Sequence, residues 1–337
     1  MIAPVRVLTV DDSPFFLDVL CGIVAVEPGL LLAGRACDGR DAVEKVLELR
    51  PDVVTMDVEM PVLDGLAALR RIMKVQPTPV IMVSSHTRRA SAATIQALQL
   101  GACDFVTKPD ALQGEGMAVL RAELVEKLLA VGRGLAARRP FVPAARSGPD
   151  RKARIVVIGA STGGTTVLTR IVNGLPAAMA ATVVVVQHMP ELYTMEFARR
   201  LSQSARCPVS EAKDGSLVEA GHVFVAPGGY QLSVYGNTFR VQKGEQVNGY
   251  RPSVDVTMQS VSRRFAPEVC GVLLTGIGRD GAHGMEEIKD AGGFTVAQDE
   301  ATSTVFGMPK AAIATGKVDY VLSDSQIGSA VAAMVAR

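Results

Sequence analysis

Apolar residues in this chain gather in short runs that alternate with amphipathic, helix-like stretches. The first series ends near residue 130, and its predicted strands are Val5 to Val10, Leu30 to Ala36, Val53 to Met56, Val80 to Val83 and Asp104 to Val106. Because these runs are continuous rather than alternating, each strand is expected to be buried on both faces of a parallel sheet. The pattern predicts a doubly wound α/β domain whose site lies at the carboxyl ends of its strands.

A second α/β series begins at Ile155. Its predicted strands are Ile155 to Ile158, Thr182 to Val186, Val223 to Ala226, Val269 to Thr275, Phe294 to Ala297 and Tyr320 to Leu322, with a hairpin over Gln231 to Val241. The two series are separated by a stretch that is rich in proline and basic residues and has no apolar period, which is typical of a linker. We therefore predict a first domain over 3–122, a linker over 123–152 and a second domain over 153–337.

Composition narrows the class of protein. The 337 residues are 48% hydrophobic and 20% charged, which is typical of well-buried globular structure. A net charge of +1 gives no electrostatic footprint for nucleic acid or an anionic membrane. The five cysteines form no CxxC pair, and no apolar run approaches the roughly 18 residues of a membrane span. We expect a cytoplasmic protein with no nucleic-acid partner and no membrane insertion.

Polar side chains follow four strands of the first series. Asp11 and Asp12 come after the first strand, Asp57 ends the third, Ser84 ends the fourth and Lys108 follows the fifth. Carboxylates crowded at one edge repel one another unless a hard cation such as Mg²⁺ neutralises them. The set predicts a phosphoryl acceptor with Asp57 as the nucleophile. A plainer alternative is that the acid pair only caps the next helix.

These residues resemble the receiver domain of two-component response regulators, over roughly residues 3 to 122. The resemblance implies a flavodoxin-like fold and phosphorylation of Asp57 by a sensor histidine kinase, CheA. It also implies that Ser84 and Lys108 sense the phosphoryl group. The implied Mg²⁺ ligands are Asp11, Asp12, Asp57 and the Glu59 carbonyl.

A serine between glycines opens the second series. Ser161 lies where a buried strand turns into a helix, a position that exposes a hydroxyl beside free helix N–H groups. His188 ends the next strand, and Asp280 follows a later one. We predict a Ser-His-Asp triad in which His188 is the base and Asp280 orients it. The expected oxyanion donors are the backbone amides of Thr162, Gly163 and Ile277.

The residues of the second series are also compatible with other interpretations. The glycine-rich turn could cradle the phosphates of a dinucleotide, although its spacing misses GxGxxG. The order Ser, His, Asp also differs from that of the α/β-hydrolases, although GxSxG is present. His222 and His283 are alternative bases. A domain that only binds DNA or a partner protein is a further alternative, which the neutral charge disfavours.

The second series is also similar to the catalytic domain of the chemotaxis methylesterase family CheB. The matching blocks are Ile158 to Gly164, Gln187 to Pro190, Ala226 to Gly228, Arg251 to Asp255, Leu274 to Gly281, Gln298 to Ser303 and Gly307 to Pro309. The resemblance implies a Rossmann-like methylesterase domain, so that the whole chain is two doubly wound α/β domains joined by a linker. It implies hydrolysis of glutamate γ-methyl esters on methyl-accepting chemoreceptors, deamidation of their glutamines and no cofactor for the esterase.

Two positions depart from the usual pattern of the methylesterase family. Ile277 replaces a methionine, and Gln231 stands where a histidine often follows the Ala-Pro-Gly block. The change at Gln231 leaves the substrate preference open. We expect phosphorylation of Asp57 to uncover the Ser161 cleft.

Overall fold

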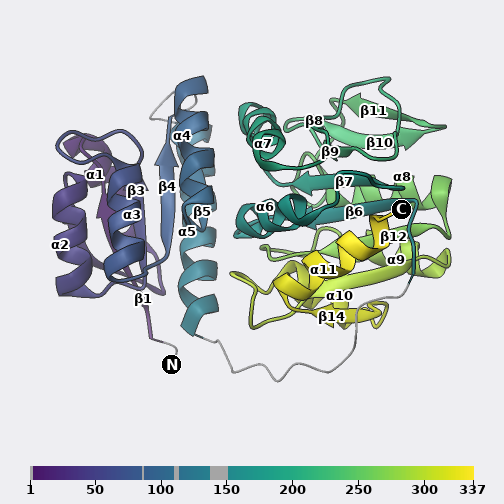
Figure 1. Cartoon of the computed structure of the whole chain (residues 1–337). Coiled ribbons are helices and arrows are strands. Elements are labelled where there is room, and N and C mark those ends of the chain that lie inside the picture. The colour runs from purple at the N-terminus through teal and green to yellow at the C-terminus, as the bar shows by residue number, and fades with distance from the viewer. Residues whose placement is uncertain (1–2, 86, 110–113, 137–150) are drawn as a thin grey trace. The chain divides into compact units, whose positions relative to one another are not determined.

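The structure is a computed structural model that describes residues 3–85, 87–109, 114–136 and 151–337 (Figure 1). The chain divides into two compact units, residues 1–137 and 138–337, and each is described by itself. The middle of the predicted linker, residues 137–150, lies outside the described residues. The rest of that stretch contains most of helix α5 (Glu115–Ala136), which crosses the predicted boundary at residue 122.

The first unit is built on a 5-stranded parallel sheet in the order β2-β1-β3-β4-β5. Its strands are β1 (Val5–Val10), β2 (Leu30–Ala36), β3 (Val53–Asp57), β4 (Val80–Ser84) and β5 (Asp104–Thr107). Its helices before α5 are α1 (Pro14–Val26), α2 (Gly39–Leu49), α3 (Gly65–Val75) and α4 (Arg88–Gln99). This strand order reverses direction between β1 and β3, so a crevice is expected at their carboxyl ends.

The second unit is built on a 7-stranded parallel sheet in the order β14-β13-β12-β6-β7-β9-β8. Its strands are β6 (Ile155–Ala160), β7 (Thr182–Gln187), β8 (Val209–Glu211), β9 (Val223–Val225), β12 (Val269–Leu273), β13 (Phe294–Gln298) and β14 (Tyr320–Leu322). The antiparallel pair β10 (Gln231–Tyr235) and β11 (Thr238–Gln242) forms the expected hairpin. These sheets confirm the predicted fold class of two parallel α/β domains.

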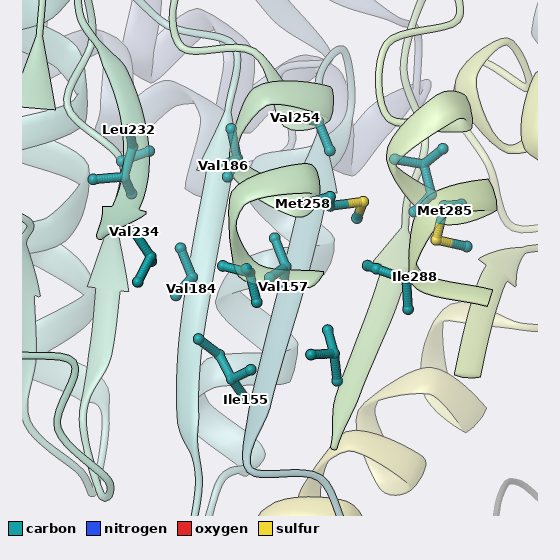
Figure 2. Packing of buried hydrophobic residues seen from close by; sticks show 14 of the residues in the cluster. Ile155, Val157, Val184, Val186, Leu232, Val234, Val254, Met258, Met285 and Ile288 are labelled. Atoms are coloured by element: carbon teal, nitrogen blue, oxygen red, sulfur yellow. The ribbon is translucent and has the colours of Figure 1, made fainter. Parts of the chain in front are cut away.

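Helices cover both faces of this second sheet (Figure 1). They are α6 (Gly164–Gly174), α7 (Glu191–Ser204), α8 (Val254–Phe265), α9 (Ala282–Asp290), α10 (Met308–Ala314) and α11 (Asp324–Val335). Figure 2 shows Met258 of α8 in one cluster with Ile155 and Val157 of β6, whereas Met285 and Ile288 of α9 lie over β12, where a Cβ on Gly271 would meet both side chains. Fully burying one such side chain contributes about 1.5–3 kcal/mol, so this core fixes the carboxyl ends of β6 and β12 firmly.

The topology also predicts where a site can form. From β6 the chain runs to β7 on one side and later returns to β12 on the other side. The crevice at this switch point lies beyond the carboxyl ends of β6 and β12. Those ends lead into Ser161 and into the turn before Asp280.

Two elements of the second unit were not expected from the sequence. The edge strand β8 has only three residues, and helix α11 follows the last strand. A capping box between Ser323 and Gln326 starts α11 and is a sequence signal that identifies this helix. Among the described residues, no helix is both long and apolar enough to cross a membrane.

Candidate active site

Ser161 is the first residue after β6, at the turn into α6. Its N–H donates to the Thr275 carbonyl at 3.0 Å, and its own carbonyl accepts from the Gly164 N–H at 2.8 Å. The turn needs Gly163, which has φ +79° and lies so close to Thr304 that a Cβ there would be 2.3 Å from its Oγ1. The serine is therefore held by backbone contacts, and 9% of its surface is exposed.

His188 lies beside Ser161 at the end of the neighbouring strand. Ala160 pairs with Gln187 across β6 and β7, and the His188 N–H donates to the Ala160 carbonyl at 3.1 Å. The Gln187 side chain also donates from Nε2 to the Ser161 carbonyl at 3.0 Å. Paired parallel strands lie about 4.8 Å apart, so the serine and the histidine follow adjacent backbone positions.

Asp280 is fully buried and accepts five hydrogen bonds. Its Oδ2 accepts from the Val254 N–H at 2.6 Å and from His188 Nε2 at 2.8 Å. The donors to Oδ1 are Asn248 Nδ2 at 3.0 Å, Ser253 Oγ at 2.7 Å and the Asp255 N–H at 3.3 Å. Two of these N–H groups belong to the first turn of α8, where the helix dipole favours an anion.

The protonation of this carboxylate follows from its surroundings. Burial alone raises the pKa of Asp280, but the hydrogen bonds from His188, Asn248 and Ser253 outweigh burial and hold the pKa below its ordinary value. Asp280 is therefore ionised at neutral pH and can only accept hydrogen bonds. Because it faces Nε2, the neutral imidazole of His188 carries its proton on Nε2 and keeps a lone pair on Nδ1.

The imidazole is also held from one side. The ring of Tyr250 stacks on His188 with centroids 3.7 Å apart and planes inclined by 8°. His188 Nδ1 is buried and has no hydrogen-bond partner in the described part of the chain. Of the predicted triad, the structure therefore joins imidazole and carboxylate and places Ser161 next to them, without a Ser161–His188 hydrogen bond. Such bonds are often long before a substrate binds.

The turn after β12 forms the other wall of this site. The Gly276 N–H donates to the Val305 carbonyl at 3.0 Å. A Cβ on Gly276 would lie 2.7 Å from the Ser161 Cβ, so the turn packs directly on the serine. Of the expected oxyanion donors, the N–H groups of Gly163 and Ile277 make no hydrogen bond to another described residue. Thr162 and Gly163 follow the serine, and Ile277 lies in this turn; their role stays a prediction.

The two alternative bases lie elsewhere. His222 hydrogen-bonds to Ser210 Oγ at 2.9 Å and stacks on Phe224. His283 is 62% exposed and lies beside acidic residues of its own helix. Neither imidazole bonds to Asp280, so position rather than residue type singles out His188.

Sequence reasoning missed two residues that touch the site. Asn248 and Tyr250 lie between β11 and α8, in a segment without hydrophobic period. The nearby block from Arg251 to Asp255 was a signal that this part of the chain approaches the site. Gln231, noted as a departure, is buried and binds only backbone groups of the same segment.

The first unit brings its predicted acidic residues together. One carboxylate oxygen from each of Asp11, Asp12 and Asp57 lies within 4.8 Å of the others. Lys108 Nζ lies 2.7 Å from Asp11 Oδ2 and 3.0 Å from Asp57 Oδ2. Burial raises the pKa of Asp57 to about 6, with Lys108 opposing and Asp11 adding to the rise. Ser84 Oγ, at the end of β4, accepts from Thr94 Oγ1 at 2.8 Å.

This cluster fits a magnesium ion. Its donor atoms are carboxylate oxygens, the hard ligands that Mg²⁺ prefers. Asp12 is exposed, while the other two acids of the cluster are buried. The side chain of Glu59 is exposed and pairs with Arg89 at 3.1 Å. The predicted ligand is the backbone carbonyl of Glu59, not this side chain. Simple helix capping explains the acid pair only in part: Asp11 Oδ1 accepts from the Ser13 N–H at 3.0 Å, but the side chain that caps α1 is that of Ser13.

Both halves of the chain match known protein families. Residues 156–331 match the CheB methylesterase family model, and residues 7–114 match the response regulator receiver domain. The chain belongs to the CheB methylesterase family. A protein-glutamate methylesterase/protein-glutamine glutaminase of Symbiobacterium thermophilum is 44% identical over 97% of this chain and 96% of the relative. A second such protein, from Pseudomonas aeruginosa, is 42% identical over 99% and 98%.

Solved structures support the assignment for the second unit. The CheB methylesterase catalytic domain of Thermotoga maritima is similar with a TM-score of 0.52 and 40% identity, over 53% of this chain and 96% of that one. The chain is therefore a two-domain hydrolase with a receiver domain and a CheB catalytic domain. This CheB assignment sets aside the alternative that the glycine-rich turn at Ser161 binds a dinucleotide.

Proposed function

We propose that this CheB-family chain hydrolyses γ-methyl esters of glutamate on methyl-accepting chemoreceptors and deamidates receptor glutamines, through a covalent intermediate on Ser161. The observation that carries the proposal is the 2.8 Å contact between His188 Nε2 and Asp280, one strand away from the serine turn. The names of its relatives supply the substrate class.

In the proposed reaction, serine, histidine and aspartate each have a separate role. His188 Nδ1 takes the proton of the Ser161 hydroxyl while Oγ bonds to the γ-carbonyl carbon of the substrate. Asp280 stabilises the imidazolium through Nε2, and the N–H groups of Gly163 and Ile277, with that of Thr162, surround the oxyanion. The imidazolium then protonates the leaving group, which departs as methanol from an ester or ammonia from an amide. Water, deprotonated by the same Nδ1, cleaves the acyl-serine.

The first unit supplies regulation in this proposal. Asp11, Asp12, Asp57 and the Glu59 carbonyl would hold Mg²⁺, which neutralises charge on the phosphoryl group during its transfer to Asp57. Lys108 contacts both buried acids and is placed to pair with the phosphoryl oxygens, while Ser84 offers a hydroxyl. The sensor histidine kinase CheA is the proposed phosphodonor, and phosphorylation is proposed to raise esterase activity.

The proposed compartment is the cytoplasm. Cys21, Cys37, Cys207 and Cys270 are free thiols, as expected in a reducing environment. No metal or other cofactor is assigned to the esterase reaction, because the serine, histidine and aspartate account for each proton transfer.

Release of methanol tests the proposal. A methylated chemoreceptor fragment is incubated with the parent, Ser161→Ala and Asp57→Asn, each with and without an acyl-phosphate phosphodonor and Mg²⁺. We expect the parent to release methanol faster with the donor, Asp57→Asn to show only the basal rate, and Ser161→Ala to release none. Methanol release by Ser161→Ala at the parent rate contradicts the nucleophile, and equal stimulation of Asp57→Asn contradicts the regulation.

A further inference from the structure

The segment of residues 244–253, here called the strap, joins the hairpin to α8 and contacts both the imidazole and the carboxylate of the site. Asn248 lies on the exposed side of the strap but turns its amide inward. Its Nδ2 lies 3.0 Å from Asp280 Oδ1 and 2.8 Å from Asp255 Oδ2. One NH₂ group therefore donates each of its two hydrogens to a different buried carboxylate.

The two hydrogen bonds from Asn248 reduce the repulsion between two neighbouring buried carboxylates. Asp255 and Asp280 lie close enough that the Asp255 N–H donates to Asp280 Oδ1. Burial raises the pKa of Asp255, and the charge of Asp280 raises it further. Asp255 is tied at its other oxygen to the Gly284 N–H, at 2.7 Å, in the first turn of α9. The amide of Asn248 thus bridges the two carboxylates directly, in addition to the bond from the Asp255 N–H.

The backbone at Asn248 is suited to this task. Its φ is +54°, a left-handed conformation that asparagine and glycine accept more readily than other residues. Glycine adopts this backbone conformation but has no amide side chain. A substitution by glycine therefore removes the amide and keeps the backbone conformation. This separation makes the contribution of the side chain measurable.

The rest of the strap fixes where Asn248 and Tyr250 sit. Gln231 Nε2 donates to the carbonyls of Glu245 and Tyr250 at 2.9 and 3.1 Å. Its Oε1 accepts from the Ser253 N–H at 2.8 Å. The buried glutamine therefore ties three points of the strap together, and its polar atoms bond to backbone rather than facing a substrate.

We propose that Asn248 is a positioning residue, whose amide fixes the Asp280 carboxylate and, through it, the orientation of the His188 imidazole. The proposal rests on the proposed function, since it assigns the imidazole as the base for Ser161. Tyr250 complements it by stacking on the ring, so that the strap controls the plane of the imidazole and the direction of its Nε2–H bond.

Asn248→Gly is the decisive variant, and Asn237→Gly in the exposed turn of the hairpin is the matched control. Loss of a hydrogen bond to a charged group corresponds to a loss in kcat of about 10- to 100-fold. We expect that loss for methanol release by Asn248→Gly, with KM within about twofold of the parent. Because the lost hydrogen bonds also stabilise the fold, the melting temperature should fall by about a few degrees. Asn248→Asp accepts the same backbone conformation but brings a third carboxylate, so we expect a larger loss.

Imidazole spectra provide a readout that does not depend on activity. The chain has four histidines, so ¹⁵N-histidine labelling gives few signals to assign. We expect His188 in the parent to populate the Nε2–H tautomer, and in Asn248→Gly to keep this tautomer with a shifted Nε2–H resonance, because the carboxylate that accepts this proton is held less firmly. An unchanged spectrum overturns the proposal whatever the rate, and so does a changed spectrum with the parent kcat. Absence of methanol release from the parent contradicts the proposed function, while the spectra still decide whether Asn248 orients the pair.

Discussion

Replacing Asp280 by asparagine removes the charge at the centre of the site while keeping nearly the same shape. The carboxylate accepts five hydrogen bonds, two at Oδ2 and three at Oδ1. An amide has one accepting oxygen, so its NH₂ group must face one of the two sets of donors. If the NH₂ group takes the place of Oδ2, it opposes the Val254 N–H and donates a hydrogen bond to His188 Nε2. The imidazole proton then moves to Nδ1, and His188 can no longer act as the base.

The magnitude follows from either orientation. At least two charge-assisted hydrogen bonds are lost, at about 1.5–3 kcal/mol each, or about 3–6 kcal/mol together. A triad carboxylate changed to an amide lowers kcat ~10⁴-fold in a serine protease, which is about 5.5 kcal/mol. We therefore expect Asp280→Asn to lose about three to four orders of magnitude in kcat.

The assay is methanol release under saturating substrate, with folding checked by circular dichroism. Asp290→Asn is the control, because Asp290 is exposed and pairs with Lys317 away from the imidazole. We expect the control to match the parent. A kcat for Asp280→Asn within tenfold of the parent would refute the assignment of Asp280 as the partner of His188.

Further expectations concern packing, titration and the strap. Gly276→Ala places a methyl group 2.7 Å from Ser161 Cβ, so kcat should fall sharply and the melting temperature should drop, whereas Gly174→Ala, with open space around it, should raise stability by about 0.5–1 kcal/mol. With a chelator present to remove Mg²⁺, Asp57→Asn should raise the free energy of unfolding of its unit by up to about 3 kcal/mol at pH 7.5. The reason is that Asp57 has a pKa of about 6 in the folded protein, so its ionisation above that pH destabilises the fold. That gain should shrink as the pH falls from 6 to 4 in denaturant titrations, and a pH-independent gain contradicts it. Gln231→Ala should lower both kcat and melting temperature, since three backbone groups lose their partner.

The sequence predicted the parallel sheets because their strands are continuous apolar runs. Strands buried on both faces give a strong signal, and the carboxyl ends of parallel strands meet at one edge. That rule placed Ser161, His188 and Asp280 on one rim and the acids around Asp57 on another. The short edge strand β8 gave too few residues for any period to be visible.

What the sequence could not predict are contacts set by side-chain direction. Nothing in the residue types determines that Nε2 of His188, rather than Nδ1, faces Asp280. Asn248 and Tyr250 lie in an irregular segment, where neither a helical nor a strand period places a side chain. Their inward orientation depends on the hydrogen bonds of Gln231, which join positions distant in sequence.

Labelling of Ser161 by a serine-reactive phosphonate tests most directly whether the serine and the imidazole act together. The rate is followed by intact mass in the parent, in His188→Gln and in His283→Gln as the matched control, with peptide mapping of the labelled residue. We expect one label on Ser161 in the parent and in His283→Gln, and a rate for His188→Gln that is at least about 100-fold lower. Labelling of Ser161 in His188→Gln at the parent rate would contradict the catalytic assignment.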